Sequence, residues 1–290
     1  MGNLFALLTA VVWAIAVILL KRSGETVPPF ALNVFRVLVS TALLVPTVIL
    51  AGQATWNDWT RQDVLLLVAS GVVAIAIADT LFHHSLNLVG AGISSIVDCL
   101  YPPFTVLFAR TMLGEELTLR QLLGMALVLG GVVAAARHDP PHGVAPRQVV
   151  LGALLGVAAM AALAFGIVLA KPALDHAPVL WATAVRQLGC LLSMLPFALL
   201  PRHRREIRAV FHPTGAWRFT LPAAICGSYL SLILWIAGMK YSKVGVAAIL
   251  NQSSTIYILV FAALFLGEPF TRRKLAASAL AVAGILLVTL

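Results

Sequence analysis

Ionisable side chains are scarce within the long apolar runs of this chain, and the few present could bind a charged small molecule or carry a proton. They are Arg36, Asp79, His83, Asp98 and Arg186. Burying such a group at the centre of a bilayer costs about 2.5–3.5 kcal/mol on insertion scales. We therefore expect each of them to face the protein interior or a water-filled cavity.

The spacing of these residues predicts which of them can meet. Asp79 and His83 are four residues apart, so they share one helix face. At a helical rise of 1.5 Å per residue, Arg36 and Asp98 lie about 9–10 Å from their nearest loops, at a depth similar to that of His83. Arg36 and Asp98 could form a structural ion pair, or Asp98 could bind a cationic substrate group, and the sequence does not decide between the two. Tyr101 follows Asp98 on the same helix face.

Asp79 and His83 also have the chemistry of a proton carrier. Histidine titrates near neutral pH, and a carboxylate one turn away could receive or release the same proton. The alternative is that the two groups only hydrogen-bond within the protein. With His84, they could suggest a metal site, but three ligands on one helix, two of them adjacent, suit tetrahedral zinc poorly. We expect no metal.

The second half of the chain offers a different set of polar groups. Arg186 corresponds to Arg36 and Asn251 corresponds to Asp98. Asp79, His83 and His84 have no Asp or His counterpart in the second half. Two tryptophans, although more often core residues, could contact a substrate. The candidate substrate-binding residues are Trp13, Arg36, Asp79, His83, Asp98, Tyr101, Arg186, Trp235 and Asn251.

The elements that position these residues are apolar helices. The 290-residue chain has a mean hydropathy of +0.98, 61% hydrophobic residues and 11% charged residues, too few charges to cover a soluble protein. Apolar runs long enough to cross about 30 Å of hydrocarbon must be helical, because lipid offers the backbone no hydrogen-bond partner. The predicted spans are 2–20, 29–51, 64–88, 92–113, 118–136, 148–170, 178–200, 217–239, 244–266 and 272–290.

Two halves of the sequence repeat each other. At an offset of 150, Lys21 matches Lys171 and Arg36 matches Arg186; at 153, Leu113-Gly114-Glu115 matches Leu266-Gly267-Glu268. The sequence therefore predicts an all-α membrane protein of ten transmembrane helices, with five-helix repeats over 1–137 and 148–290. Because five is odd, the second repeat enters the membrane from the opposite side, an arrangement that many secondary transporters use.

The repeated motifs resemble those of the EamA group of the drug/metabolite transporter superfamily. They comprise Pro102-Pro103, Leu113-Gly114-Glu115-Glu116-Leu117-Thr118, Gly-rich fifth and tenth helices, and Arg36-Val37-Leu38 in the second span. The chain departs from the family pattern at Val12-Trp13-Ala14 and in the ninth span, which lacks proline. The resemblance implies a central cavity lined by helices 1, 3, 4, 6, 8 and 9.

We therefore expect a secondary-active transporter that exports small polar metabolites such as amino acids by alternating access. Alternatives are an intramembrane enzyme, a drug or other-metabolite permease of the same fold, and a passive channel. Motifs for an enzyme or for ATP binding are absent from the sequence, so we expect neither catalysis nor a cofactor.

The expected partners are a small-molecule substrate and the lipid bilayer of the inner (plasma) membrane. The net charge of +9 comes mostly from loop residues, and we expect no nucleic-acid partner. The loop charges favour both termini outside, whereas the family resemblance favours both inside. The oligomeric state is left open.

Overall fold

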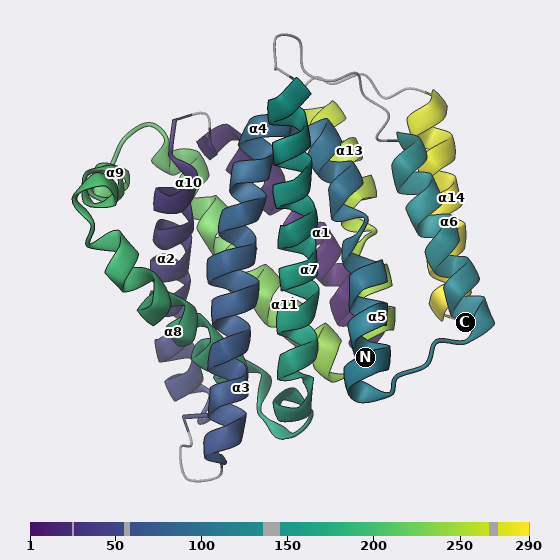
Figure 1. Ribbon diagram of the computed structural model, residues 1–290, viewed down its shortest axis with the longest axis horizontal. Helices are drawn as coiled ribbons and strands as arrows, with labels where there is room; N and C mark the ends of the chain where they lie inside the picture. Colours follow the sequence, from purple (N-terminus) through teal and green to yellow (C-terminus); the bar gives the residue numbers. More distant parts are fainter. Residues whose placement is uncertain (25, 55–58, 136–145, 267–271, 290) are drawn as a thin grey trace.

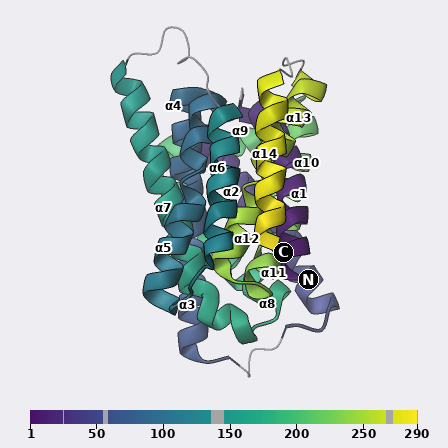
Figure 2. The ribbon, with the colours of Figure 1, turned by 90° about the vertical axis from the view of Figure 1, so that its right-hand side faces the viewer.

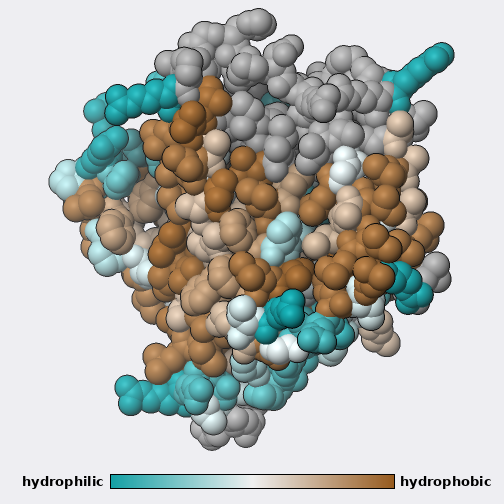
Figure 3. Space-filling view, turned by 45° about the vertical axis from the view of Figure 1, so that its right-hand side comes forward, coloured by the Kyte–Doolittle hydropathy of each residue, from teal (hydrophilic) through white to brown (hydrophobic). Residues whose placement is uncertain are grey.

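The computed structural model describes residues 1–24, 26–54, 59–135, 146–266 and 272–289, and all regular secondary structure in this part of the chain is helical. Six of its helical segments are long and apolar enough to cross a membrane: Gly2–Gly24, Pro29–Leu50, Arg61–Leu86, Arg147–His176, Val179–Ala198 and Trp217–Lys240. Shorter apolar segments cover Leu119–Gly131 and Val244–Ile258. Figure 3 shows a broad hydrophobic band between hydrophilic groups toward the two ends. The chain is a multi-pass membrane protein.

The first half of the chain contains six α-helices and one π-helix in the described region. A capping box between Thr60 and Asp63 starts the third helix, and Gly114, at φ 67°, ends the fifth. Both devices satisfy backbone groups that a helix end leaves unpaired. The elements are α1 (Gly2–Gly24), α2 (Pro29–Leu50), α3 (Arg61–Gly71), η1 (Val72–Ile77), α4 (Ala78–Asp98), α5 (Tyr101–Leu113) and α6 (Leu119–Ala135).

The second half repeats the irregularities of the first. The two π-helices begin 153 residues apart, at Val72 and Ile225, and the helix breaks after Asp98 and Asn251 are also 153 residues apart. The elements are α7 (Pro146–His176), α8 (Val179–Ala198), α9 (Pro201–Phe211), α10 (Trp217–Ala224), η2 (Ile225–Leu230), α11 (Ser231–Lys240), α12 (Val244–Asn251), α13 (Ser254–Leu266) and α14 (Arg272–Thr289).

The long first helices of the two halves, α1 and α7, run in opposite directions. In Figure 1, α1 begins toward the lower end of the molecule, where both termini lie, and α7 begins at the upper end; Figure 2 gives the same directions. At the side of the bundle, α6 packs closely on α14, since a Cβ on Gly124 would lie 2.8 Å from the Gly284 carbonyl oxygen. Small residues allow helix backbones to approach this closely in a membrane.

Each π-helix packs on the first helix of the other half through one glycine and one alanine. A Cβ on Gly166 of α7 would lie 2.8 Å from Ala74 Cβ in η1, and a Cβ on Gly227 of η2 would lie 3.1 Å from Ala16 Cβ in α1. The two crossings use corresponding positions with glycine and alanine exchanged. They bring the π-helices to the middle of the bundle.

Four features differ from the sequence predictions. The predicted connection at 89–91 is helical, and the span 92–113 is interrupted at residues 99–100. Pro102 and Pro103 lack the N–H groups that a continuous helix would require, which explains a break just before them. The span 244–266 is interrupted at residues 252–253, where no proline follows, and α9 lies between two of the predicted spans.

Candidate functional site

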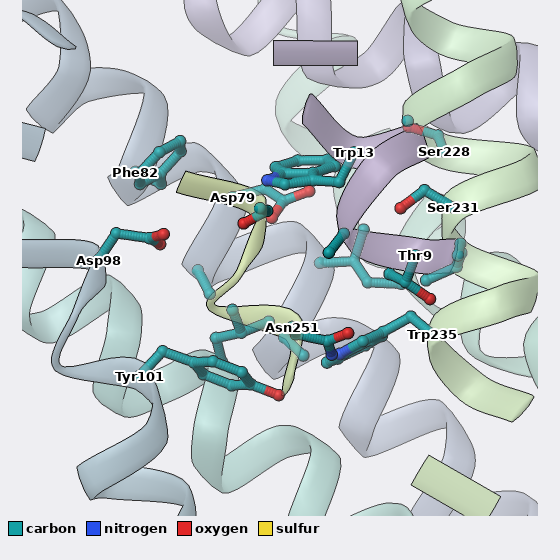
Figure 4. Close-up of a pocket in the computed structure, with 18 of the residues that line it drawn as sticks. Thr9, Trp13, Asp79, Phe82, Asp98, Tyr101, Ser228, Ser231, Trp235 and Asn251 are labelled. Atoms are coloured by element: carbon teal, nitrogen blue, oxygen red, sulfur yellow. The ribbon is translucent and has the colours of Figure 1, made fainter. Parts of the chain in front are cut away.

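A cavity of about 140 Å³ lies where the two helix breaks and the two π-helices meet. Figure 4 shows polar and aromatic side chains converging on it from several helices. The lining includes residues of α1, η1, α4, α5, α7, η2, α11, α12 and α13, which lie in or next to the predicted spans 1, 3, 4, 6, 8 and 9, but also Arg36 of α2 and Gln187 of α8, which lie outside those spans. Seven of the nine candidate residues line it: Trp13, Arg36, Asp79, Asp98, Tyr101, Trp235 and Asn251.

Arg36 holds together a polar cluster at one side of the cavity. Its Nε donates to Ser228 Oγ at 2.9 Å, its Nη1 lies 2.8 Å from His83 Nε2, and its Nη2 lies 3.8 Å from Asp79 Oδ2. Its guanidinium carbon also lies 5.9 Å from the centre of the Trp13 ring. Because arginine has no acceptor, His83 Nε2 accepts the hydrogen bond and is unprotonated in this state. His83 is buried behind the cavity wall.

This cluster corrects one hypothesis drawn from the sequence. The ion pair of Arg36 is with Asp79, and the described residues include none with Asp98. One arginine side chain reaches both Asp79 and His83 because they lie one turn apart on the same helix face. A π-helix also changes the phase of the residues that follow it, so counting along a straight helix could not predict which carboxylate would meet Arg36.

Asp98 is the last residue of α4 and points from it into the cavity (Figure 4). In the described part of the chain, no cationic side chain lies within ion-pair distance of its carboxylate. Asp98 is therefore a half-buried acid that lacks a counter-ion among the described residues.

A second group of polar atoms lies toward the opposite side of the cavity. Arg186 is fully buried; its Nη1 donates to Ser70 Oγ at 2.6 Å, but its Nε and Nη2 have no partner among the described residues. The Tyr101 hydroxyl is buried and likewise unpartnered there. The Arg186 guanidinium lies 5.4 Å from the centre of the Trp235 ring, which forms the cavity wall beside it.

Asn251, at the other helix break, fixes the position of Trp235. With its amide oriented to satisfy both neighbours, its nitrogen donates to Ala6 O at 2.8 Å and its oxygen accepts from Trp235 Nε1 at 2.9 Å. This tryptophan is therefore held by α1 and α12 together. The main role of Asn251 at the cavity is therefore to hold the Trp235 ring in place.

The sequence did not reveal several residues of the lining. Ser228 binds Arg36, but a serine inside an apolar run carries no distinguishing signal. Phe82 closes the wall next to Asp98 in Figure 4 and reads in the sequence as an ordinary core residue. The other polar lining residues that were missed are Thr9, Gln187, Ser231, Gln252 and Ser254.

Comparison with known proteins identifies the family of this membrane protein. The model of the EamA-like transporter family matches residues 1–137 and again 150–290. The chain belongs to the EamA-like transporter family. A solved structure that is 21% identical in sequence superposes with a TM-score of 0.78 and covers 99% of this chain and 96% of its own, which supports the same fold.

Relatives of this EamA-like transporter match along its whole length. An uncharacterized transporter of Archaeoglobus fulgidus is 25% identical over 289 residues, which cover 99% of this chain and 97% of that protein. A probable terminal-alkyne amino-acid exporter of Streptantibioticus cattleyicolor is also 25% identical over 289 residues, covering 97% and 91%. An uncharacterized transporter of Bacillus subtilis, YetK, is 21% identical over 262 residues, covering 88% and 76%. The relatives and the family are named as transporters, as the sequence led us to expect.

Proposed function

We propose that this protein is a secondary-active transporter that exports small zwitterionic metabolites such as amino acids. The observation that carries the proposal is a pair of opposite charges that have no counter-ion among the described residues. Asp98 is an acid without a cation, and Arg186 is a buried base without a carboxylate. A buried charge without a partner is costly, so a ligand that supplies both counter-charges would be stabilised.

The substrate would lie across the cavity between these two groups. Its ammonium group would pair with Asp98, and its carboxylate would accept hydrogen bonds from the Tyr101 hydroxyl and from the free nitrogens of Arg186. Since Arg186 is sealed behind the wall in this state, the Trp235 ring would have to shift for direct contact. Trp13 and Phe82 would contact an apolar side chain.

The repeat in the structure supports a ten-helix transporter with inverted repeats over 1–137 and 148–290. The π-helices, the helix breaks and the Gly–Ala crossings recur at corresponding positions, and α1 and α7 run in opposite directions. Inverted repeats give a protein two related conformations, one open to each side. Alternating access in the inner (plasma) membrane would follow from an exchange between them.

Contacts at the end where the N-terminus lies would form one of the two gates. Lys171 Nζ, also paired with Asp175, donates to three carbonyl oxygens at the end of α11, those of Met239 at 2.8 Å, Lys240 at 3.2 Å and Ser242 at 3.4 Å. Glu115 accepts from the first backbone N–H groups of α12, Val244 and Gly245, at 3.2 and 3.5 Å. These contacts tie the α11–α12 connection to α7 and to the segment after α5. Together they would close the cavity at this end.

Proton coupling through Asp79 and His83 is part of the same proposal. Protonation of His83 Nε2 would break its hydrogen bond from Arg36. It would also add a second positive charge to the cluster, which Asp79 would have to balance. A proton could thereby change how α4 packs on α2. In proteoliposomes, an imposed pH gradient should drive accumulation, and Asp79→Asn should abolish that accumulation but leave downhill exchange. Wild-type flux that ignores the gradient would contradict coupling.

The substrate class is tested by binding of three matched ligands to purified protein. The ligands are an apolar amino acid, its amide, which lacks the carboxylate, and the corresponding carboxylic acid, which lacks the amine. We expect only the amino acid to raise the melting temperature, since a ligand that binds only the folded state stabilises it. An equal shift with a neutral hydrophobic compound would instead favour a drug or other-metabolite permease.

A further inference from the structure

Helix α9, in the connection between α8 and α10, has one apolar face and one strongly basic face. The apolar face packs on α2: Val210 is buried, the rings of Phe35 and Phe211 lie 5.0 Å apart, and those of Phe30 and His203 lie 4.7 Å apart. Its arginines all point outward and are exposed: Arg202, Arg204, Arg205 and Arg208. The protein therefore holds the helix in place while its charges stay free.

Three of these arginines line one concavity. Arg208 follows Arg204 by four residues and Arg205 by three, so the three side chains lie on one side of the helix. Together with Leu199 and Pro201 they border an open concavity. The single acid of α9, Glu206, lies 3.4 Å from His203. In the described part of the chain, no carboxylate lies within ion-pair distance of the three arginines. The concavity thus offers three uncompensated positive charges.

The rim of this concavity continues into the lipid-facing surface of α8. Leu199, directly after α8, is 71% exposed. Within the last turns of α8, Phe197 is 59% exposed and Leu192 is 64% exposed. Pro201 starts α9 directly after this apolar surface. An occupant would therefore meet positive charge at one end and hydrocarbon-facing side chains at the other.

We propose that this concavity binds an anionic phospholipid. The lipid phosphate would accept hydrogen bonds from Arg204, Arg205 and Arg208, and an acyl chain would lie along Leu199 and Phe197. Arginine forms paired hydrogen bonds with phosphate oxygens, and basic residues near a membrane surface attract anionic lipids. A soluble phosphate would satisfy the arginines but not the apolar rim. The bound lipid would anchor the end of α8, the helix that places Gln187 at the cavity and Arg186 behind its wall.

The test uses the full-length protein purified in detergent and two triple variants. The first, Arg204→Gln/Arg205→Gln/Arg208→Gln, removes the proposed site. The second, Arg61→Gln/Arg110→Gln/Arg120→Gln, removes the same charge from exposed arginines elsewhere. The ligands are phosphatidylglycerol, phosphatidylcholine and inorganic phosphate, and binding is followed by the melting temperature and by lipid retention in native mass spectrometry.

We expect the wild-type protein and the control variant to bind phosphatidylglycerol in preference to phosphatidylcholine. The α9 variant should bind it more weakly by on the order of 100-fold, which corresponds to about a fivefold loss for each of the three charges. Equal affinity of the α9 variant and the wild type would overturn the proposal, as would equal binding of the two lipids. Protection by inorganic phosphate at the same concentration would also overturn it in favour of a free anion.

A second measurement needs no variant. Phosphatidylglycerol with a photoactivatable acyl chain should label peptides from 192–211 of the wild-type protein, and unlabelled phosphatidylglycerol should compete. Labelling spread evenly over the lipid-facing helices would contradict a defined site. Neither experiment depends on which substrate the central cavity transports.

Discussion

Replacing Asp98 by asparagine separates a substrate-binding acid from a structural one. If Asp98 pairs with the ammonium group of the substrate, the variant leaves that group desolvated without its counter-charge. Truncating one partner of such a pair costs about 2–5 kcal/mol, so binding should weaken by roughly 30-fold to 3,000-fold at about 1.4 kcal/mol per tenfold change. Asparagine keeps the shape of the side chain, so the effect reports charge.

The stability of the empty protein should rise or stay the same in Asp98→Asn. Loss of one partner of a buried ion pair costs about 3–5 kcal/mol, but Asp98 has no cationic partner among the described residues. Its replacement removes a desolvated charge and should leave the melting temperature of the empty protein unchanged or higher. Glu116→Gln, at an exposed carboxylate away from the cavity, is the matched control.

The assay measures melting temperature with and without an apolar amino acid, for wild type and both variants. We expect Asp98→Asn to melt normally when empty and to show no ligand-dependent shift at concentrations that saturate the wild type. If the variant binds like wild type, Asp98 does not hold the amine. If it melts at a much lower temperature when empty, Asp98 has a structural partner and the reasoning fails.

Four further substitutions test the surrounding structure. Asp79→Asn should destabilise the protein by about 3 kcal/mol in denaturation measurements, because it leaves the buried Arg36 charge without its counter-ion. At 3.8 Å and an effective dielectric constant of about 20, the two charges attract each other by about 4 kcal/mol. A second substitution in the same chain, Arg36→Gln, should restore part of the lost stability. Arg186→Gln should reduce the rise in melting temperature that the amino acid causes in the same thermal assay, and Glu116→Gln should keep it; an unchanged rise in Arg186→Gln would contradict a carboxylate site. Gly71→Ala should lower the stability by about 1–3 kcal/mol, since its Cβ would clash with the Arg186 carbonyl oxygen, and an unchanged melting temperature would refute that close approach. Lys171→Met should speed hydrogen exchange in the last turn of α11, and unchanged protection there would rule out the proposed gate.

The family and the helical class could be predicted from the sequence because they depend on composition and on repeated motifs. Arg36, Asp98 and Tyr101 were identified as cavity residues because charged or polar groups within apolar runs must face the protein interior. The partner of Arg36 could not be predicted, since it depends on the phase of α4 after η1. Nothing in the residues of Val72–Ile77 marks a π-helix.

The basic helix α9 had a signal that the sequence analysis did not use. Proline at its first position and apolar residues at helical spacing, Ile207 and Val210, are typical of a short amphipathic helix. The sequence analysis placed this segment between the predicted spans 178–200 and 217–239 and assigned it no element. The uncompensated charge of Arg186 had no signal of this kind, because a missing partner becomes visible only when the neighbouring helices are placed.

Counterflow is the most direct test of the account. Proteoliposomes loaded with an unlabelled apolar amino acid should take up the labelled amino acid transiently against its gradient, and the substrate should be recovered chemically intact. Asp98→Asn should abolish this uptake at the same protein density, and Glu116→Gln should retain it. Uptake that only equilibrates, without a transient overshoot, would indicate a passive pore, and equal counterflow in Asp98→Asn would contradict the proposed site.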